Sequence, residues 1–120
     1  MRTAPSNCRT SETDVTNWKT LAEAFGPQRQ DALRRELELL RVQVTKAQQD
    51  QDWHVQVVTE LRDAIATGPD GIKVAAAMEL PEWIEELNRS QGKRQKLARE
   101  LEAVRVRLAN CQVITRGIQR

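Results

Sequence analysis

Residues 33–65, LRRELELLRVQVTKAQQDQDWHVQVVTELRDAI, carry a regular stripe of mostly apolar side chains. Such a stripe, with steps that alternate between four and three residues, is typical of a helix that packs along another helix. The segment therefore predicts one long helix with a narrow buried side. Its stripe positions are Leu33, Leu37, Leu40, Val44, Ala47, Gln51, His54, Val58, Leu61 and Ile65.

A second stripe with the same alternation follows, and TGPDG at residues 67–71 lies between the two as a cluster of turn-forming residues. Its positions are Trp83, Leu87, Ser90, Arg94, Leu97, Leu101, Val104, Leu108, Cys111, Thr115 and Ile118. When the chain folds back at the turn, the stripes align in one constant register. In that register Val58 meets Ser90, His54 meets Arg94, Gln51 meets Leu97 and Leu37 meets Cys111. The sequence thus predicts an all-α fold, an antiparallel two-helix coiled-coil hairpin.

The remaining segments fit around this hairpin. Residues 1–13 are polar and without periodicity, which predicts a disordered tail. A short helix with Trp18, Leu21 and Phe25 on one side is expected to pack near the open end of the hairpin. Pro81 is expected to open the second long helix, because proline suits a first helical position. We expect a single hairpin domain over 14–120, with helices at about 14–25, 28–66, 72–79 and 81–116.

Four polar residues interrupt the stripes near the middle of the hairpin: Gln51, His54, Ser90 and Arg94. A polar layer of this kind lowers stability but penalises slipped registers, since a slip would bury polar groups against leucines. The alternative is that His54 is a metal ligand, a pH sensor or a general base. No carboxylate or cysteine lies at stripe spacing to complete a metal site, so we interpret the layer as structural.

Several apolar residues lie outside the stripes, and isolated exposed apolar residues are normal on proteins. The alternative is a contact surface for a second copy or another protein. We favour that surface, with Trp53 as its anchor, because tryptophan is enriched among the residues that dominate binding energy. The short N-terminal helix could cover Leu39 and Val42. The predicted interface residues are Trp53, Val57, Leu39, Val42, Ile84 and Val106.

The net charge of +2 does not itself imply a nucleic-acid or membrane partner. Basic residues nevertheless gather between Arg89 and Arg107, where the segment contains seven Lys or Arg and two acidic residues, Glu100 and Glu102. The predicted register places Asp50, Asp52 and Glu60 opposite this segment. We therefore interpret it as a partly paired, solvated face, with contact to a phosphate backbone as the alternative.

Residues 18–37, WKTLAEAFGPQRQDALRREL, have Gly26 between two helical patterns and several basic or amide side chains after it. This segment resembles the helix-turn-helix of bacterial and phage DNA-binding proteins, in which the second helix reaches base edges. The resemblance covers about 20 of the 120 residues, and the proline after the turn glycine departs from the family pattern. It implies possible nucleic-acid contacts at Arg29, Arg34 and Arg35, and the basic segment between Arg89 and Arg107 adds Lys93 and Lys96 as possible phosphate contacts.

The sequence holds no nucleotide-binding glycine loop, no HExxH and no second histidine. Cys8 and Cys111 form neither a disulfide framework nor a zinc motif, and no apolar run is long enough for a bilayer. We therefore expect an intracellular, soluble protein that is not an enzyme and uses no cofactor, metal, small molecule or membrane.

These observations favour a structural or adaptor protein that acts by helix-mediated association, as a homo-oligomer or as a subunit of a larger complex. An inhibitor that lays its hairpin face on a partner would have the same sequence features. The alternative function is a small DNA-binding regulatory protein of phage or plasmid type. The sequence leaves open whether the hairpin tip is itself a contact.

Overall fold

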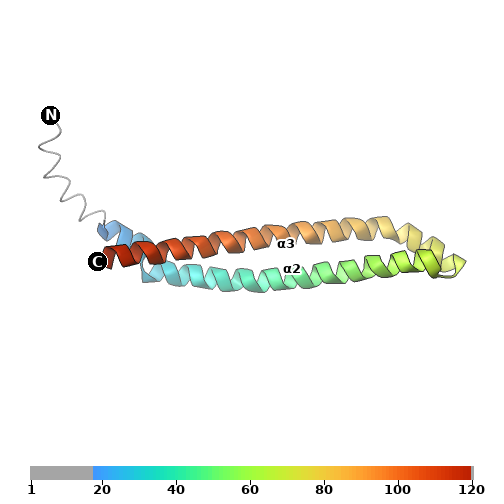
Figure 1. Ribbon diagram of the computed structural model, residues 1–120, viewed down its shortest axis with the longest axis horizontal. Coiled ribbons are helices and arrows are strands. Elements are labelled where there is room, and N and C mark those ends of the chain that lie inside the picture. The colour runs from blue at the N-terminus through green and yellow to red at the C-terminus, as the bar shows by residue number, and fades with distance from the viewer. Residues whose placement is uncertain (1–17, 120) are drawn as a thin grey trace, which may run out of the picture. The chain divides into compact units, whose positions relative to one another are not determined.

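The computed structural model describes residues 18–119, which are helical apart from breaks at Gly26 and at Gly68-Pro69. A helix at 18–25 precedes α2 (Pro27–Thr67) and α3 (Asp70–Gln119), as Figure 1 shows. Residue contacts define two compact units, one formed by the chain up to Glu38 with the chain from Glu102 onward, the other by Leu39–Leu101. In each unit a segment of α2 lies beside a segment of α3. The predicted all-α helical hairpin is confirmed.

The two predicted stripes form the buried sides of α2 and α3. Every stripe position from Leu33 to Ile65 and from Trp83 to Ile118 is buried or half-buried. Such a core is narrow, because a helix with this repeat turns only two of every seven residues fully toward its partner. The most deeply buried stripe residues are Leu33, Ala47, Val58, Val104 and Cys111.

The predicted turn is confirmed and is short. The backbone N–H of Gly68 donates to the carbonyl of Ala64 over 2.9 Å, and the N–H of Lys73 donates to the carbonyl of Pro69 over 2.8 Å. A Cβ at residue 68 would lie 2.5 Å from the Ala64 carbonyl oxygen. Glycine is therefore needed here because the backbone of the preceding turn is close.

The expected start of a helix at Pro81 is wrong, as is the separate helix at 72–79. Pro81 lies inside α3, which begins at Asp70. Proline removes one helical hydrogen bond, to the carbonyl of Ala77, and both residues are exposed, so water can satisfy that carbonyl. Figure 1 shows that α3 bends in this yellow segment, as expected near a proline. The buried Ala76 and half-buried Leu80 continue the four-and-three spacing, which is the signal for the longer helix.

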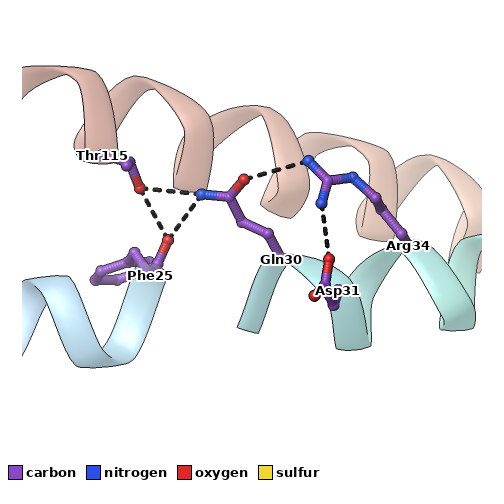
Figure 2. Close-up of polar contacts among 5 residues, drawn as sticks. All are labelled: Phe25, Gln30, Asp31, Arg34 and Thr115. Atoms are coloured by element: carbon purple, nitrogen blue, oxygen red, sulfur yellow. Dashed lines mark hydrogen bonds and ion pairs between the residues drawn. The ribbon is translucent and has the colours of Figure 1, made fainter. Parts of the chain in front are cut away.

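At the helix break at Gly26, side chains supply hydrogen bonds to the backbone, as Figure 2 shows. The carbonyl of Phe25 accepts hydrogen bonds from Gln30 Nε2 and from Thr115 Oγ1, each over 3.0 Å. Gln30 Nε2 also donates to Thr115 Oγ1 over 3.0 Å. A carbonyl at a helix end lacks its usual backbone donor. Gln30 and Thr115 replace that donor and attach the end of the helix at 18–25 to α3.

Gln30 was not predicted as a core residue, although only 8% of its surface is exposed. It lies three residues before Leu33 and so continues the stripe. The side chains of Leu21 and Phe25 are half-buried, but Trp18 is 51% exposed and does not share their packing. The predicted tail at 1–13 and the predicted first residues of the short helix, 14–17, lie outside the described residues.

Gly26→Ala is expected to lower the free energy of unfolding by about 1–3 kcal/mol. A Cβ at this residue would lie 2.2 Å from the Ala22 carbonyl oxygen, so the bend could not keep its geometry. Chemical denaturation followed by far-ultraviolet circular dichroism measures the change. Gly92→Ala is the matched control, because a Cβ there meets nothing within 4 Å and alanine stabilises a helix interior by about 0.5–1 kcal/mol. Equal effects of the two substitutions would contradict this account.

Candidate interaction surface and polar layer

The polar layer, defined as Gln51, His54, Ser90 and Arg94, does form, and its members bond in two pairs within the unit Leu39–Leu101. Ser90 Oγ hydrogen-bonds to His54 Nδ1. Arg94 Nε donates to Gln51 Oε1 over 2.5 Å. Ser90 is buried and the other three are half-buried. The structure thus brings the four residues together as two hydrogen-bonded pairs, His54 with Ser90 and Gln51 with Arg94.

The Ser90 hydroxyl determines which nitrogen of His54 carries the proton. Ser90 Oγ donates to the Glu86 carbonyl over 2.8 Å, as serine in a helix often does one turn back. A hydroxyl has a single hydrogen, so Ser90 Oγ can only accept from the imidazole. Neutral His54 therefore carries its proton on Nδ1. The imidazole ring also contacts Trp83, with ring centroids 5.9 Å apart and tilted by 50°.

The predicted register is wrong by one helical turn. His54 bonds with Ser90 where Arg94 was expected, and Gln51 bonds with Arg94 where Leu97 was expected. The other unit shows the same offset, since Cys111 shares a cavity with Leu33 where Leu37 was expected as its neighbour. The physical reason is hydrogen bonding. The predicted register would set imidazole against guanidinium and leave the Gln51 amide against a leucine, whereas the observed one pairs both donors with acceptors.

The polar groups of the layer bond to one another and to the Glu86 carbonyl. Among the described residues, no buried side-chain nitrogen or oxygen is without a hydrogen-bond partner. The same part of the chain brings together no set of three His, Cys, Asp or Glu side chains that could hold a metal ion.

An open cavity of about 180 Å³ lies beside the polar layer, within the same unit. From α2 it is lined by Ala47, Asp50 and His54. From α3 it is lined by Glu86, Arg89, Ser90 and Lys93. Arg89 pairs with Glu86 and, over 3.9 Å, with Glu85, both on its own helix. Of the lining residues, Asp50, Arg89 and Lys93 are exposed, whereas His54 is half-buried and Ser90 is buried.

Three of the six predicted interface residues form one strongly exposed set on α2, which we call the α2 outer surface: Leu39 (58% exposed), Val42 (60%) and Trp53 (57%). The expectation that the short helix covers Leu39 and Val42 is therefore wrong. Val57 and Ile84 are only half-buried and contribute less exposed area. Val106 is 49% exposed but belongs to the other unit.

The segment that resembles a helix-turn-helix does not have that geometry. Helices in this motif are joined by a turn of three or four residues. Only Gly26 separates the helix at 18–25 from α2, and the Gln30 N–H still donates to the Gly26 carbonyl over 3.0 Å. Residues 18–67 are thus better described as one bent helix.

The predicted nucleic-acid contacts are exposed but divided between the two units. Arg29, Arg34 and Arg35 belong to one unit, and Lys93 and Lys96 to the other. Arg34 is engaged locally, by Asp31 Oδ1 over 3.0 Å and by Gln30 Oε1 over 3.4 Å (Figure 2).

The acidic residues expected opposite the basic segment bond mainly within α2. Gln48 donates to Asp52 over 2.9 Å, and Gln56 donates to Glu60 over 3.4 Å. Asp50 shares a cavity with Arg89 and Lys93. Most of the expected pairing across the hairpin is therefore replaced by contacts one turn apart on a single helix.

Comparison of the chain with protein-family models, with curated proteins and with solved structures gives no match. Among the described residues, neither long helix holds an apolar run of the length that crossing a membrane requires.

Gln51→Leu alone is expected to lower the free energy of unfolding by about 1 kcal/mol or more, because the half-buried Arg94 guanidinium loses an acceptor. Replacing Gln51 and Arg94 together by leucine should restore or exceed the original stability, since an apolar pair commonly packs at least as well as a buried polar one. Urea denaturation of both variants tests this. A double variant that is less stable than the original chain would contradict this expectation and show that the pair itself supplies net stability.

Proposed function

We propose that the chain is a non-enzymatic structural or adaptor protein that acts by helix-mediated association. It would associate with copies of itself or serve as a subunit of a larger complex. The observation that carries this proposal is the α2 outer surface, where Leu39, Val42 and Trp53 each expose more than half of their surface.

These three side chains form a coherent set because of their spacing. Leu39 and Trp53 are two heptads apart and so project from the same side of α2, with Val42 one turn beyond Leu39. Single exposed apolar residues need no explanation. A set that is aligned along one helix and includes tryptophan is more typical of a contact surface.

The free energy of folding also favours burial of the α2 outer surface against a partner. A hairpin of two helices buries only a narrow stripe on each, and small folds have little stability to spare. Removing an exposed leucine, valine or tryptophan side chain from water contributes roughly 1 kcal/mol or more. A partner helix laid along α2 would bury all three together.

The polar groups support a non-enzymatic role. His54 and Ser90 are the residues best suited to chemistry, and they bond to each other inside the polar layer. Ser90 gives its only hydrogen to a backbone carbonyl, so its hydroxyl is not oriented as a nucleophile activated by the imidazole. Adaptor and inhibitor roles would use the same surface and differ only in the partner.

A photoreactive amino acid placed at residue 53, in cells that make the protein, tests the proposal. We expect a covalent adduct with another protein chain, since the side chain at 53 would lie within the contact. Mass spectrometry of the adduct identifies the chain that is captured.

The matched control carries the same photoreactive group at Met78, which is 78% exposed but lies in α3, away from the α2 outer surface. Adduct formation at 53 well above that at 78 supports the proposal. Equal yields at both sites, or none at 53, would show that the surface is not a contact.

A further inference from the structure

Trp53 and the cavity beside the polar layer lie next to each other along α2. Asp50 lines the cavity, and Trp53 is three residues further on, so the two side chains project from neighbouring positions of the same side. The unit Leu39–Leu101 thus presents a protruding indole and an open cavity about one helical turn apart.

We propose that the cavity is the binding site for Trp53 of a second copy of this chain, and that the exchange is reciprocal. Each copy would insert its own indole into the cavity of the other. The inference rests on the proposed function, because it specifies which partner covers the α2 outer surface.

The cavity has a suitable size for an aromatic side chain. A cavity of about 150 Å³ is enough to hold a benzene molecule, and this one measures about 180 Å³. Its open mouth leaves room for the second ring of the indole to lie partly outside.

The lining also matches the chemistry of an indole. The indole N–H is a donor without an acceptor, and the Asp50 and Glu86 carboxylates in the lining can accept it. Arg89 and Lys93 can lie over the ring face, where a cation is attracted by the π-system. Because Arg89 and Lys93 are exposed, their charged heads can stay hydrated while their aliphatic stems contact the ring.

A two-fold axis that passes between Asp50 and Trp53 satisfies both insertions at once. It exchanges the indole of one copy with the cavity of the other and makes a closed dimer rather than a filament. The two α2 helices then cross in opposite directions. The facing positions along α2 are Leu39 with Ala64, Gln43 with Glu60, Lys46 with Val57, and Asp50 with Trp53.

This alignment opposes no two like charges along α2. Lys46 faces the apolar Val57, Glu60 faces the Gln43 amide, and Leu39 faces Ala64. Like charges directly opposite one another would penalise the pairing. The side of α2 that carries Trp53 is therefore compatible with its own copy in the antiparallel direction.

Sedimentation equilibrium of the purified full chain over a range of concentrations tests the proposal. We expect a dimer whose dissociation constant rises about 30-fold or more in Trp53→Ala, the loss typical of a binding hot spot. Met78→Ala is the control and should leave dimerisation unchanged. Circular dichroism on the same samples must show unchanged helicity.

A mixing experiment tests the reciprocal exchange. Asp50→Arg puts a long side chain in the cavity mouth, where Glu86 can pair with it, and so blocks the cavity while keeping the indole. Trp53→Ala keeps the cavity and removes the indole. Each variant alone should dimerise poorly, and an equimolar mixture should form heterodimers, because one indole still meets one intact cavity.

The facing positions supply a second test. Gln43→Glu would set a carboxylate against Glu60 of the second copy at two symmetric contacts, and should weaken the dimer by about threefold or more. Gln49→Glu makes the same chemical change at an exposed position outside the facing set, and should have a smaller effect.

A helical chain that stays monomeric at all concentrations overturns the proposal, as does a dimer that is insensitive to Trp53→Ala. Failure of the mixed variants to form heterodimers overturns the reciprocal exchange. The proposed function fails on a different observation, the lack of a specific adduct at residue 53. An adduct with a different protein, from a chain that is monomeric alone, would leave that function standing and exclude the second copy as the partner.

Discussion

The hydrogen bonds of the polar layer are the constraint on which the arrangement of α2 and α3 depends. Apolar stripes alone do not select one register, because a shift by one turn still places leucines against leucines. The layer removes this degeneracy. In the observed register His54 bonds with Ser90 and the Arg94 guanidinium bonds with Gln51. The register that satisfies both bonds is the one observed.

This explains why the sequence predicts the hairpin but not its alignment. The four-and-three spacing identifies both long helices and nearly every buried position, since burial depends on the period of the pattern alone. Register depends on which side chains bond with which, and the constant alignment inferred from spacing paired His54 with another donor. The helix start predicted at Pro81 was wrong because the general preference of proline for the start of a helix was outweighed by the buried stripe, which continues through Ala76 and Leu80.

The candidate surface was predictable only in part. Leu39, Val42 and Trp53 lie far from the stripe, so their exposure follows directly from the helical period. Val57 and Ile84 lie next to stripe positions and are half-buried, as expected for side chains that border a helix pair. The cavity could not be found from sequence at all. It arises where Asp50 and Ala47 of α2 meet Glu86 and Lys93 of α3, and that meeting depends on the correct register.

Register and recognition are therefore linked in this hairpin. A slip of one turn would carry Glu86 and Lys93 away from Asp50, and the cavity would lose one of its walls. The apolar stripes would tolerate that slip far better than the polar layer does. Burying Ser90 and half-burying Arg94 lowers the stability of the hairpin, but it favours one alignment of α2 and α3 over the others. That alignment places a cavity beside an exposed tryptophan. A hairpin with a uniformly apolar core could be more stable and still lack a defined surface.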